Sequence, residues 1–333
     1  MVLAPREEFE TLTDPFRREL LAHCYRMLGS IQDAEDQVQE VYIRAWRSFD
    51  QFEGRSSLRV WMYKIATRVC LTALETRTRR HLPSDLQGPS HDSNPHLEVA
   101  ESSLRWVQPI PDSLIAGPGD DPAARQNSRA GIRLAFIAAL QSLSARQRAV
   151  LILRDVLSMK AVEVAEILDT TTIAVNGALR RARSQLEMSG VTQNEVLEPE
   201  GEALRLVVDR YVEAFERADI NALIDLLRTD VELEMPPIPT WFTGRDAVSA
   251  FFASRVMLRP QSWSMHPTRA NGQVAFAVYE RLPGDCVAAH GVHVLTFLGE
   301  RIARITVFND PSLLPKFGFA TVAAQSSNPA TQE

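Results

Sequence analysis

The sequence has few cysteines, and none in a pattern that binds a metal or forms a disulfide framework. Cys24, Cys70 and Cys286 lie far apart, are odd in number, and include no Cys-x-x-Cys pair or histidine at ligand spacing. No apolar run approaches the length of a membrane span, and the N-terminus turns acidic within seven residues, unlike a targeting segment. We therefore expect a reduced, soluble, cytoplasmic protein with no metal, no cofactor and no membrane partner.

The chain also lacks the excess of positive charge that is typical of proteins that bind DNA on their own. Its formal net charge is −6 over 333 residues. The charge is uneven, because residues 81–124 hold one Lys or Arg against seven Asp or Glu, whereas residues 125–188 hold ten against five. A DNA-reading surface is therefore expected in the second of these blocks.

The hydrophobic pattern predicts a multidomain chain, since 333 residues exceed what one core usually supports. Apolar residues recur at three- and four-residue steps through residues 10–82 and 128–190, which indicates two all-α modules, a helical bundle and a helix-turn-helix domain. Residues 83–127, rich in Pro, Gly, Ser and Asp, read as an acidic linker. Residues 203–318 mix amphipathic helices with alternating strands, which predicts an α+β domain, and residues 319–333 form a flexible tail.

The stretch EVAEILDTTTIAVNGALRRARSQL, Glu163 to Leu186, has the pattern of a helix-turn-helix. Its break falls at Asp169, where glycine is usual because the turn needs a positive φ, and aspartate adopts that conformation at modest cost. The second helix would present its start to phosphates and its outer face to base edges and backbone. An ordinary helical hairpin with a solvated basic face is the alternative. The predicted DNA-binding residues are Thr171, Thr172, Ala174, Asn176, Arg180, Arg181 and Arg183.

An acidic face is predicted on the helix DAEDQVQEVYIRAW. Asp33, Asp36 and Glu40 recur at three- and four-residue spacing, so they share one side of the helix while the apolar residues face the core. Paired carboxylates can bind metals, but no histidine accompanies these. A protein-docking face or a plain solvated surface fits better.

A further helix is predicted in SSLRVWMYKIATRVCLTALETRTRR, which opens with serine as an N-cap and closes with arginines that suit a helix C-terminus. Aromatic and basic residues alternate here and in the segment just before it. Such a mixture suits single-stranded nucleic acid, because aromatic rings stack on unpaired bases while cations follow the phosphates. The alternative is that Trp61 and Tyr63 are ordinary core aromatics. The predicted DNA-binding residues of this segment are Phe52, Arg55, Trp61, Tyr63, Lys64 and Arg68.

These segments carry a resemblance to a known family. LLAHCYRMLGSIQDAEDQVQEVYIRAW, SSLRVWMYKIATRVCLTAL and LSARQRAVLILRDVLSMKAVEVAEILDTTTIAVNGALRRARSQL are similar to regions 2 and 4 of bacterial RNA polymerase sigma factors of the extracytoplasmic-function (ECF) group. FTGRDAV and NDPSLLPKFGF resemble the SnoaL-like domain that is fused to a subset of these factors. The whole chain is most similar to SigG-type factors.

The resemblance implies a transcription initiation factor without an active site, whose partners are core RNA polymerase and promoter DNA. The segment from Phe52 to Arg68 would melt and capture the minus-ten element, and the helix-turn-helix would read the minus-thirty-five element. At Arg68 the family often has asparagine. The linker would thread through the polymerase channels, which are positive inside. The docking surface for the polymerase β′ clamp, complemented by contact with the β flap, would comprise Asp33, Asp36, Gln37 and Glu40.

For the C-terminal part the resemblance implies a SnoaL/NTF2-like cone with a cavity, in a family that includes cyclases and isomerases. A regulatory role is expected, with a small ligand of unknown identity; fold analogy alone does not establish catalysis. The alternatives are a DNA-binding regulator that acts without polymerase and a SnoaL-like cyclase or isomerase. The candidate cavity residues are Met235, Trp241, Phe242, His266, Tyr279, His290 and His293.

Overall fold

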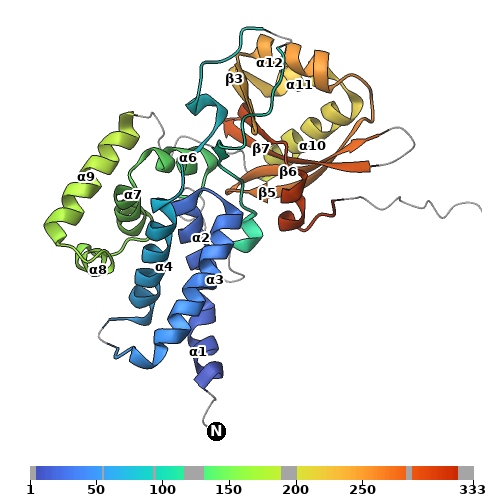
Figure 1. Cartoon of the computed structure of the whole chain (residues 1–333). Helices are drawn as coiled ribbons and strands as arrows, with labels where there is room; N and C mark the ends of the chain where they lie inside the picture. Colours follow the sequence, from blue (N-terminus) through green and yellow to red (C-terminus); the bar gives the residue numbers. More distant parts are fainter. Residues whose placement is uncertain are drawn as a thin grey trace, which may run out of the picture. The chain divides into compact units, whose positions relative to one another are not determined.

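The structure is a computed structural model that describes residues 5–54, 56–92, 95–115, 131–188, 201–282 and 287–321. It divides into two compact units, one formed by residues 1–81 and 102–194 and the other by residues 82–101 and 195–333 (Figure 1). Among the described residues, no helix combines the length and the apolar content that a membrane crossing requires. Arg55, Cys286 and the tail beyond residue 321 lie outside the described residues.

The first helices of the first unit are α1 (Pro5–Thr13), α2 (Arg17–Leu28), α3 (Ile31–Ser48) and α4 (Leu58–Glu75). Gly29 ends α2 in the left-handed conformation, and the Ser30 hydroxyl caps α3 by accepting a hydrogen bond from the Asp33 N–H. Ser57 caps α4 in the same way, which confirms the N-cap expected there. The apolar faces of α2, α3 and α4 pack together into one small bundle.

The helix α4 ends earlier than its arginine-rich sequence predicts. It stops at Glu75, and the chain continues into a two-residue strand, β1 (Arg80–His81), that pairs in parallel with β2 (Arg105–Trp106). Arg80 explains the change, because its guanidinium bonds both the Asp33 carboxylate and the Trp106 carbonyl. These partly buried contacts hold Arg80 in an extended segment, not at the helix C-terminus where the sequence predicts arginine.

Further helices among the described residues of the first unit are α6 (Leu134–Ser142), α7 (Ala145–Leu151), α8 (Ala161–Ile167) and α9 (Thr172–Met188), with a π-helical turn, η5 (Ile152–Val156), after α7. The pair α8 and α9 is the predicted helix-turn-helix. Asp169 stands at the break with φ of 47°, the left-handed conformation expected of that position. Val164 and Val175 are fully buried between the helices.

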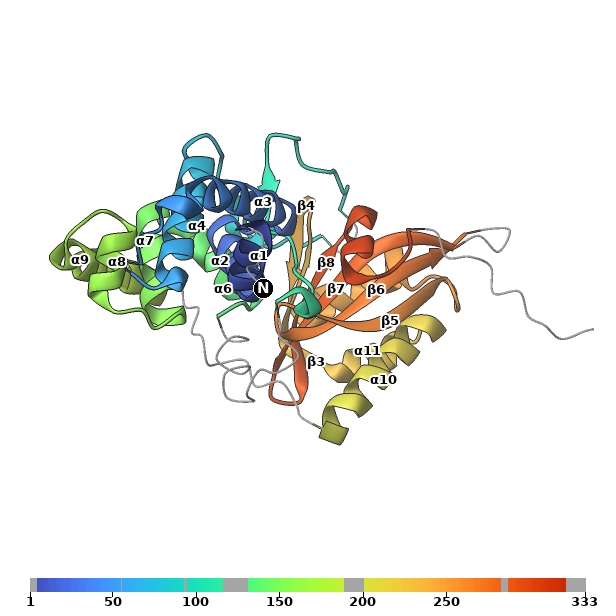
Figure 2. The ribbon, with the colours of Figure 1, turned by 90° about the horizontal axis from the view of Figure 1, so that it is seen from below.

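The second unit is an α+β domain. Its helices are α10 (Gly201–Arg217), α11 (Ile220–Leu226) and α12 (Arg245–Phe251), and its strands are β3 (Leu227–Met235), β4 (Ile238–Thr243), β5 (Trp263–Ala270), β6 (Gln273–Arg281), β7 (Val287–Leu298) and β8 (Arg301–Phe308). The sheet order is β4-β3-β8-β7-β6-β5, in which only the β3–β8 pair is parallel. Figure 2 shows α10 and α11 next to each other across one face of this sheet. The predicted fold class is confirmed.

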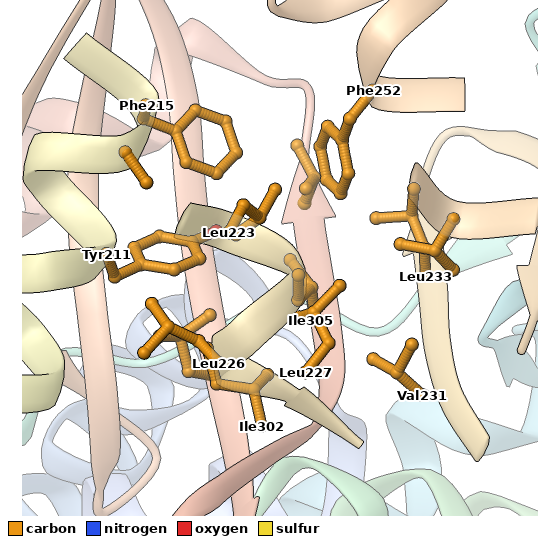
Figure 3. Packing of buried hydrophobic residues seen from close by; sticks show 14 of the residues in the cluster. Tyr211, Phe215, Leu223, Leu226, Leu227, Val231, Leu233, Phe252, Ile302 and Ile305 are labelled. Atoms are coloured by element: carbon orange, nitrogen blue, oxygen red, sulfur yellow. The ribbon is translucent and has the colours of Figure 1, made fainter. Parts of the chain in front are cut away.

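The core of this domain lies between the helices and the sheet. Tyr211 and Phe215 from α10 point toward Leu223 of α11, and Ile302 and Ile305 of β8 meet them from the sheet (Figure 3). The sheet tolerates no side chain at one position of β7, since a Cβ on Gly291 would lie 1.9 Å from the carbonyl oxygen of Phe308. Apolar side chains at alternate strand positions therefore build this core, as the sequence alternation predicts.

Candidate nucleic-acid interface

Four of the predicted DNA-binding residues of the first module gather around one depression. Phe52, Trp61, Lys64 and Arg68 line a cavity of about 440 Å³ at the end of α3 and along α4. The rings of Phe52 and Trp61 lie 5.1 Å apart at 43°. Lys64 and Arg68 are one turn apart on α4, so both cations face the same side of the aromatic pair. The arrangement offers ring faces and positive charge together, which is what an unstacked base with its phosphate needs.

Tyr63 is placed differently from its neighbours. Its side chain is completely buried, its hydroxyl donates to the Glu19 carboxylate at 3.2 Å, and the Arg59 guanidinium lies 5.1 Å from the ring centroid. Burial, reinforced by Glu19, raises the pKa of this phenol. In this arrangement Tyr63 is a core aromatic that supports α4 against α2, and its ring face is not exposed to a base.

The two cations of the depression are engaged by the turn of the helix-turn-helix. The Asp169 carboxylate accepts a hydrogen bond from Arg68 and lies 3.1 Å from the Lys64 ammonium. The hydrogen bond from Arg68, with that from Lys64, holds the pKa of Asp169 below its usual value. A glycine at this left-handed turn would have no side chain. The Asp169 carboxylate instead connects the predicted DNA-binding face of α4 to the α8–α9 pair.

The outer face of α9 is exposed over most of its predicted DNA-reading positions. Thr171 caps the helix, its hydroxyl accepting from the Ala174 N–H at 3.2 Å, and the half-buried Thr172 begins the first turn. Arg183 differs, because its guanidinium makes a two-pronged ion pair with Asp155 at 2.7 and 2.9 Å. The exposed predicted residues of this helix are Ala174, Asn176, Arg180, Arg181 and Arg183.

The predicted acidic face of α3 separates into two environments. Asp33 turns inward, where Arg77 lies 2.9 Å and Arg80 2.6 Å from its carboxylate. Asp36 is exposed, and Gln37 and Glu40 are half-buried on the outer side of the helix. Glu40 pairs with Arg44 at 2.6 Å one turn further along. The outward surface of α3 therefore consists of Asp36, Gln37 and Glu40, while Asp33 fastens the helix to the end of α4.

Two buried arginines join the helical modules, and the sequence pattern gave no indication of them. The Arg26 guanidinium donates to the Gly131 carbonyl at 2.8 Å, and Arg148 donates to the Met27 carbonyl and, at 2.6 Å, to the Gln141 side chain. Burial lowers the pKa of each arginine to about 10. The sequence pattern predicts that a single arginine in an amphipathic helix is exposed. Its role as a hydrogen-bond donor between the modules is evident only from the contact between them.

The candidate cavity residues of the C-terminal domain lie in separate places. Phe242 packs in the core, its ring 4.7 Å from that of Phe251, while the Trp241 indole N–H donates to the Gln87 carbonyl at 2.8 Å. His266 is exposed on β5, in edge contact with Tyr279. The structure does not gather these residues around one reacting centre.

Two histidines of this domain, His290 and His293, are poor candidates for a general base. His293 is buried, 3.5 Å from the Tyr211 hydroxyl, and burial, with a smaller effect of His290, lowers its pKa to about 3. His290 packs against Trp263 with a centroid distance of 4.9 Å, and burial lowers its pKa also. A proton acceptor at neutral pH needs a higher pKa and access to a substrate. His293 instead behaves as a neutral core residue.

Comparison with known proteins adds independent findings. The chain matches family models for Sigma-70 region 2 at residues 12–80, Sigma-70, region 4 at residues 133–186 and the SnoaL-like domain at residues 208–305. It is 44% identical over 315 residues to the ECF RNA polymerase sigma factor SigG of Mycobacterium tuberculosis, covering 94% of this chain and 84% of that one. It is 26% identical over 306 residues to the probable ECF RNA polymerase sigma factor SigI of the same organism, covering 90% and 92%. The crystal structure of the M. tuberculosis extracytoplasmic function sigma factor SigJ shares the fold, with a TM-score of 0.60 at 22% identity over 94% of this chain and 99% of that chain.

Proposed function

Because the chain belongs to the ECF RNA polymerase sigma factors, we propose that it binds core RNA polymerase and directs it to specific promoters. Residues 12–80 act as region 2, and residues 133–186 act as region 4. The observation that carries the proposal is the pairing of two different surfaces in one chain. One offers ring faces and cations around a depression, and the other offers an exposed basic helix.

Region 2 captures the melted minus-ten element. Phe52 and Trp61 stack on unpaired bases, and Lys64 and Arg68 follow the phosphates. Arg55 belongs to the same segment of the sequence and joins this set as a phosphate contact. Tyr63 supports the site from beneath, where its bond to Glu19 fixes α4.

Region 4 reads the minus-thirty-five element from the major groove. The N-terminal half of α9 presents Ala174 and Asn176 toward base edges, with Arg180 and Arg181 one turn further along for the backbone. Thr171 and Thr172 lie at the helix N-terminus, where backbone N–H groups favour a phosphate. Arg183 reaches DNA only by exchanging its ion pair with Asp155 for one with phosphate.

The polymerase contact includes the outer side of α3. Asp36, Gln37 and Glu40 form the part of that surface that faces outward, and the β′ clamp is the proposed partner, with the β flap contacting region 4. Asp33 contributes indirectly by holding α3 against Arg77 and Arg80. The protein acts in the cytoplasm, where polymerase and promoter DNA are found.

Free and promoter-bound chains differ in the contact between regions 2 and 4. In the structure Asp169 engages Lys64 and Arg68, so these two cations contact phosphate only after the turn of region 4 has moved away. The C-terminal domain has a regulatory role, which the separate positions of the candidate cavity residues favour over catalysis. A small ligand of this domain stays a prediction.

Reconstituted run-off transcription with core polymerase tests the proposal. The whole chain is compared with a chain truncated after residue 196 and with the variant Asp36→Lys, whose matched control is Asp50→Lys on the turn that follows α3. We expect promoter-dependent transcripts from the whole chain, an altered yield after truncation, and loss of polymerase pull-down for Asp36→Lys only. Absence of any transcript and of any association with core polymerase would overturn the assignment. Duplex binding as tight as that of the holoenzyme, without transcription, would favour an independent DNA-binding regulator.

A further inference from the structure

The segment that connects region 2 to region 4 is partly built into the C-terminal domain. Residues 82–101 belong to the same compact unit as the sheet. Strand β4 is the edge of that sheet, so one row of its backbone groups has no neighbouring strand. Two carbonyls of this row accept hydrogen bonds from the connecting segment: Pro239 from the Gln87 side-chain amide at 3.0 Å, and Trp241 from the Ser90 N–H at 2.7 Å. The carbonyl of Pro237, which directly precedes β4, accepts from the Ala100 N–H at 3.0 Å.

Side chains of the domain hold the same segment at further points. The Trp241 indole N–H donates to the Gln87 carbonyl at 2.8 Å, and the fully buried Glu234 carboxylate accepts from the Ser84 N–H at 3.0 Å. Leu97 packs against the apolar core of the domain. A hydrogen bond to a carboxylate is stronger than one to a neutral acceptor, so Glu234 is the firmest of these anchors.

The anchors fold the segment back on itself. Ser84 is tied to Glu234 and Ala100 to Pro237, two positions only three residues apart in the sequence. A segment from residue 84 to residue 100 can extend to roughly 55 Å, whereas three residues of backbone span at most about 11 Å. The parallel bridge of β1 and β2 closes the loop at its base, because it sets His81 beside Trp106. While the loop is docked, most of its residues therefore add nothing to the distance that the connector can span.

We propose that strand β4 of the SnoaL-like domain is a docking edge for residues 82–101, and that this docking limits the reach between regions 2 and 4. The inference rests on the proposed function, since reach matters only if both regions bind one promoter. Elements at minus ten and minus thirty-five lie about 85 Å apart along DNA at roughly 3.4 Å per base pair. Release of the segment from β4, followed by opening of the two-residue bridge between β1 and β2, gives regions 2 and 4 the length with which to separate.

The contacts specify the occupant. Most of them use backbone atoms of the connector, as in the addition of a strand to a sheet edge, and the contacts of Trp241 and Glu234 fix its register. The segment carries the prolines Pro83, Pro89 and Pro95, which suit an edge because a proline lacks the N–H that a further strand would require. The occupant of the β4 edge is therefore the connector of the same chain, and not a separate protein.

The test removes connector donors while leaving the domain core unchanged. In the full-length chain, Ser90→Pro together with Ala100→Pro deletes the two backbone N–H groups that bond Trp241 and Pro237. His91→Pro is the matched control, since His91 is exposed and takes part in none of the bonds to β4 described above. Trp241→Phe, which keeps the ring and loses the indole donor, is a second variant on the other side of the contact. Amide hydrogen exchange reports docking, and run-off transcription at limiting chain concentration reports reach.

We expect amides of residues 84–100 to exchange at least about tenfold faster in the double variant, because each lost bond is worth roughly a factor of two to ten. Amides of β6–β8 should keep their protection, which shows that the domain remains folded. Transcription should rise several-fold in the double variant and in Trp241→Phe, and His91→Pro should match the parent chain. Unchanged exchange at residues 84–100, or faster exchange with equal transcription, overturns the inference while the proposed function stands. Absence of transcripts from every chain, parent included, overturns the proposed function and with it this role of the docking.

Discussion

The sigma half and the C-terminal half of the chain differ in the kind of contact that holds each of them together internally. In the sigma half, polar contacts join region 2 to region 4 beside the buried apolar residues of α2 and α6. Arg26 and Arg148 reach backbone carbonyls across the junction, and Asp169 engages two cations of α4. In the C-terminal half, the helices meet the sheet through an apolar cluster that includes Tyr211 and Phe276, whose rings stack at 5.2 Å.

The kind of contact determines how much free energy is needed to open each junction. A polar contact is replaced by water when its partners separate, so its net contribution is only about 0.5–1.5 kcal/mol. An apolar core has no such replacement, and exposing it costs about 25 cal/mol per Å². The polar contacts between regions 2 and 4 can therefore be exchanged for water at small cost, whereas α10 and α11 cannot leave their sheet without exposing its core.

The largest effect is expected from the apolar half. Phe276→Ala removes a fully buried ring from the sheet side of the core and should lower the free energy of unfolding by about 3–5 kcal/mol. Leu258→Ala, at a side chain that is 63% exposed, is the control and should change it little. Denaturant unfolding followed by hydrogen exchange in each half checks this. Equal losses of protection in α2–α4 and in β6–β8 would contradict the division into two kinds of junction.

A smaller effect is expected at the polar junction. Arg148→Met leaves the Met27 carbonyl and the Gln141 side chain buried without their donor, at a cost of about 1–3 kcal/mol. The loss should fall on the contact between regions 2 and 4, seen as faster exchange of amides at the junction while the helices stay folded. Arg146→Met, exposed on the same helix, is the control. Complete unfolding of α2–α4 in Arg148→Met would show that the junction is part of a single core.

Acid should weaken both halves, because each contains a buried histidine whose pKa is lowered to about 3: His23 and His293. In the C-terminal half burial lowers the pKa of His290 as well, so acid should weaken that half more. The folded state keeps each ring neutral while the unfolded chain takes up a proton below its pKa of 6.5, so stability falls as pH drops from 6.5 toward 3. Between about pH 7 and pH 5 each histidine should cost up to about 2 kcal/mol. Urea unfolding of His23→Gln and His293→Gln should each show a shallower pH slope in the affected half. A pH slope that is unchanged in both variants would contradict this prediction. The control is His96→Gln, because His96 is exposed.

The smallest effect is expected at the exposed ion pairs of Asp169. Asp169→Asn retains a residue that adopts the left-handed turn but removes the carboxylate that engages Lys64 and Arg68. Since these groups are largely exposed, the loss of stability should stay below about 1 kcal/mol. In the parent chain this contribution is present above the unfolded pKa of 3.8 and is lost as pH falls through the lowered folded value. Binding of single-stranded minus-ten DNA should rise at low salt in the variant. Asp155→Asn, which frees Arg183 instead, should leave that binding unchanged.

Periodicity and turn chemistry predicted much of the fold. The spacing of apolar residues indicated the helices of both sigma regions, Ser57 marked the start of α4, and Asp169 marked the turn between α8 and α9. Alternation indicated the strands of the C-terminal domain. These features are local, because a helix face, a cap or a turn depends on residues within a few positions of one another.

The contacts between distant segments could not be predicted from such patterns. The spacing of Asp33 along its helix predicts an exposed carboxylate, but Asp33 contacts Arg77 and Arg80. The composition around Tyr63 predicts a ring that stacks on bases, but Tyr63 is buried. Residues 82–101 have the composition of a linker, and that composition describes how a segment behaves without a partner. In the folded chain these residues bind the edge strand β4, and the pattern of residues along the sequence does not indicate that contact.

The short parallel bridge between Arg80–His81 and Arg105–Trp106 has a consequence for how the sequence can vary. Because the two ends of the intervening loop are held next to each other, residues can be inserted or deleted within it without shifting the register of the helices before and after. A peptide tag placed near His91, which is exposed and lies between the anchors at Ser90 and Ala100, should therefore leave these helices in place.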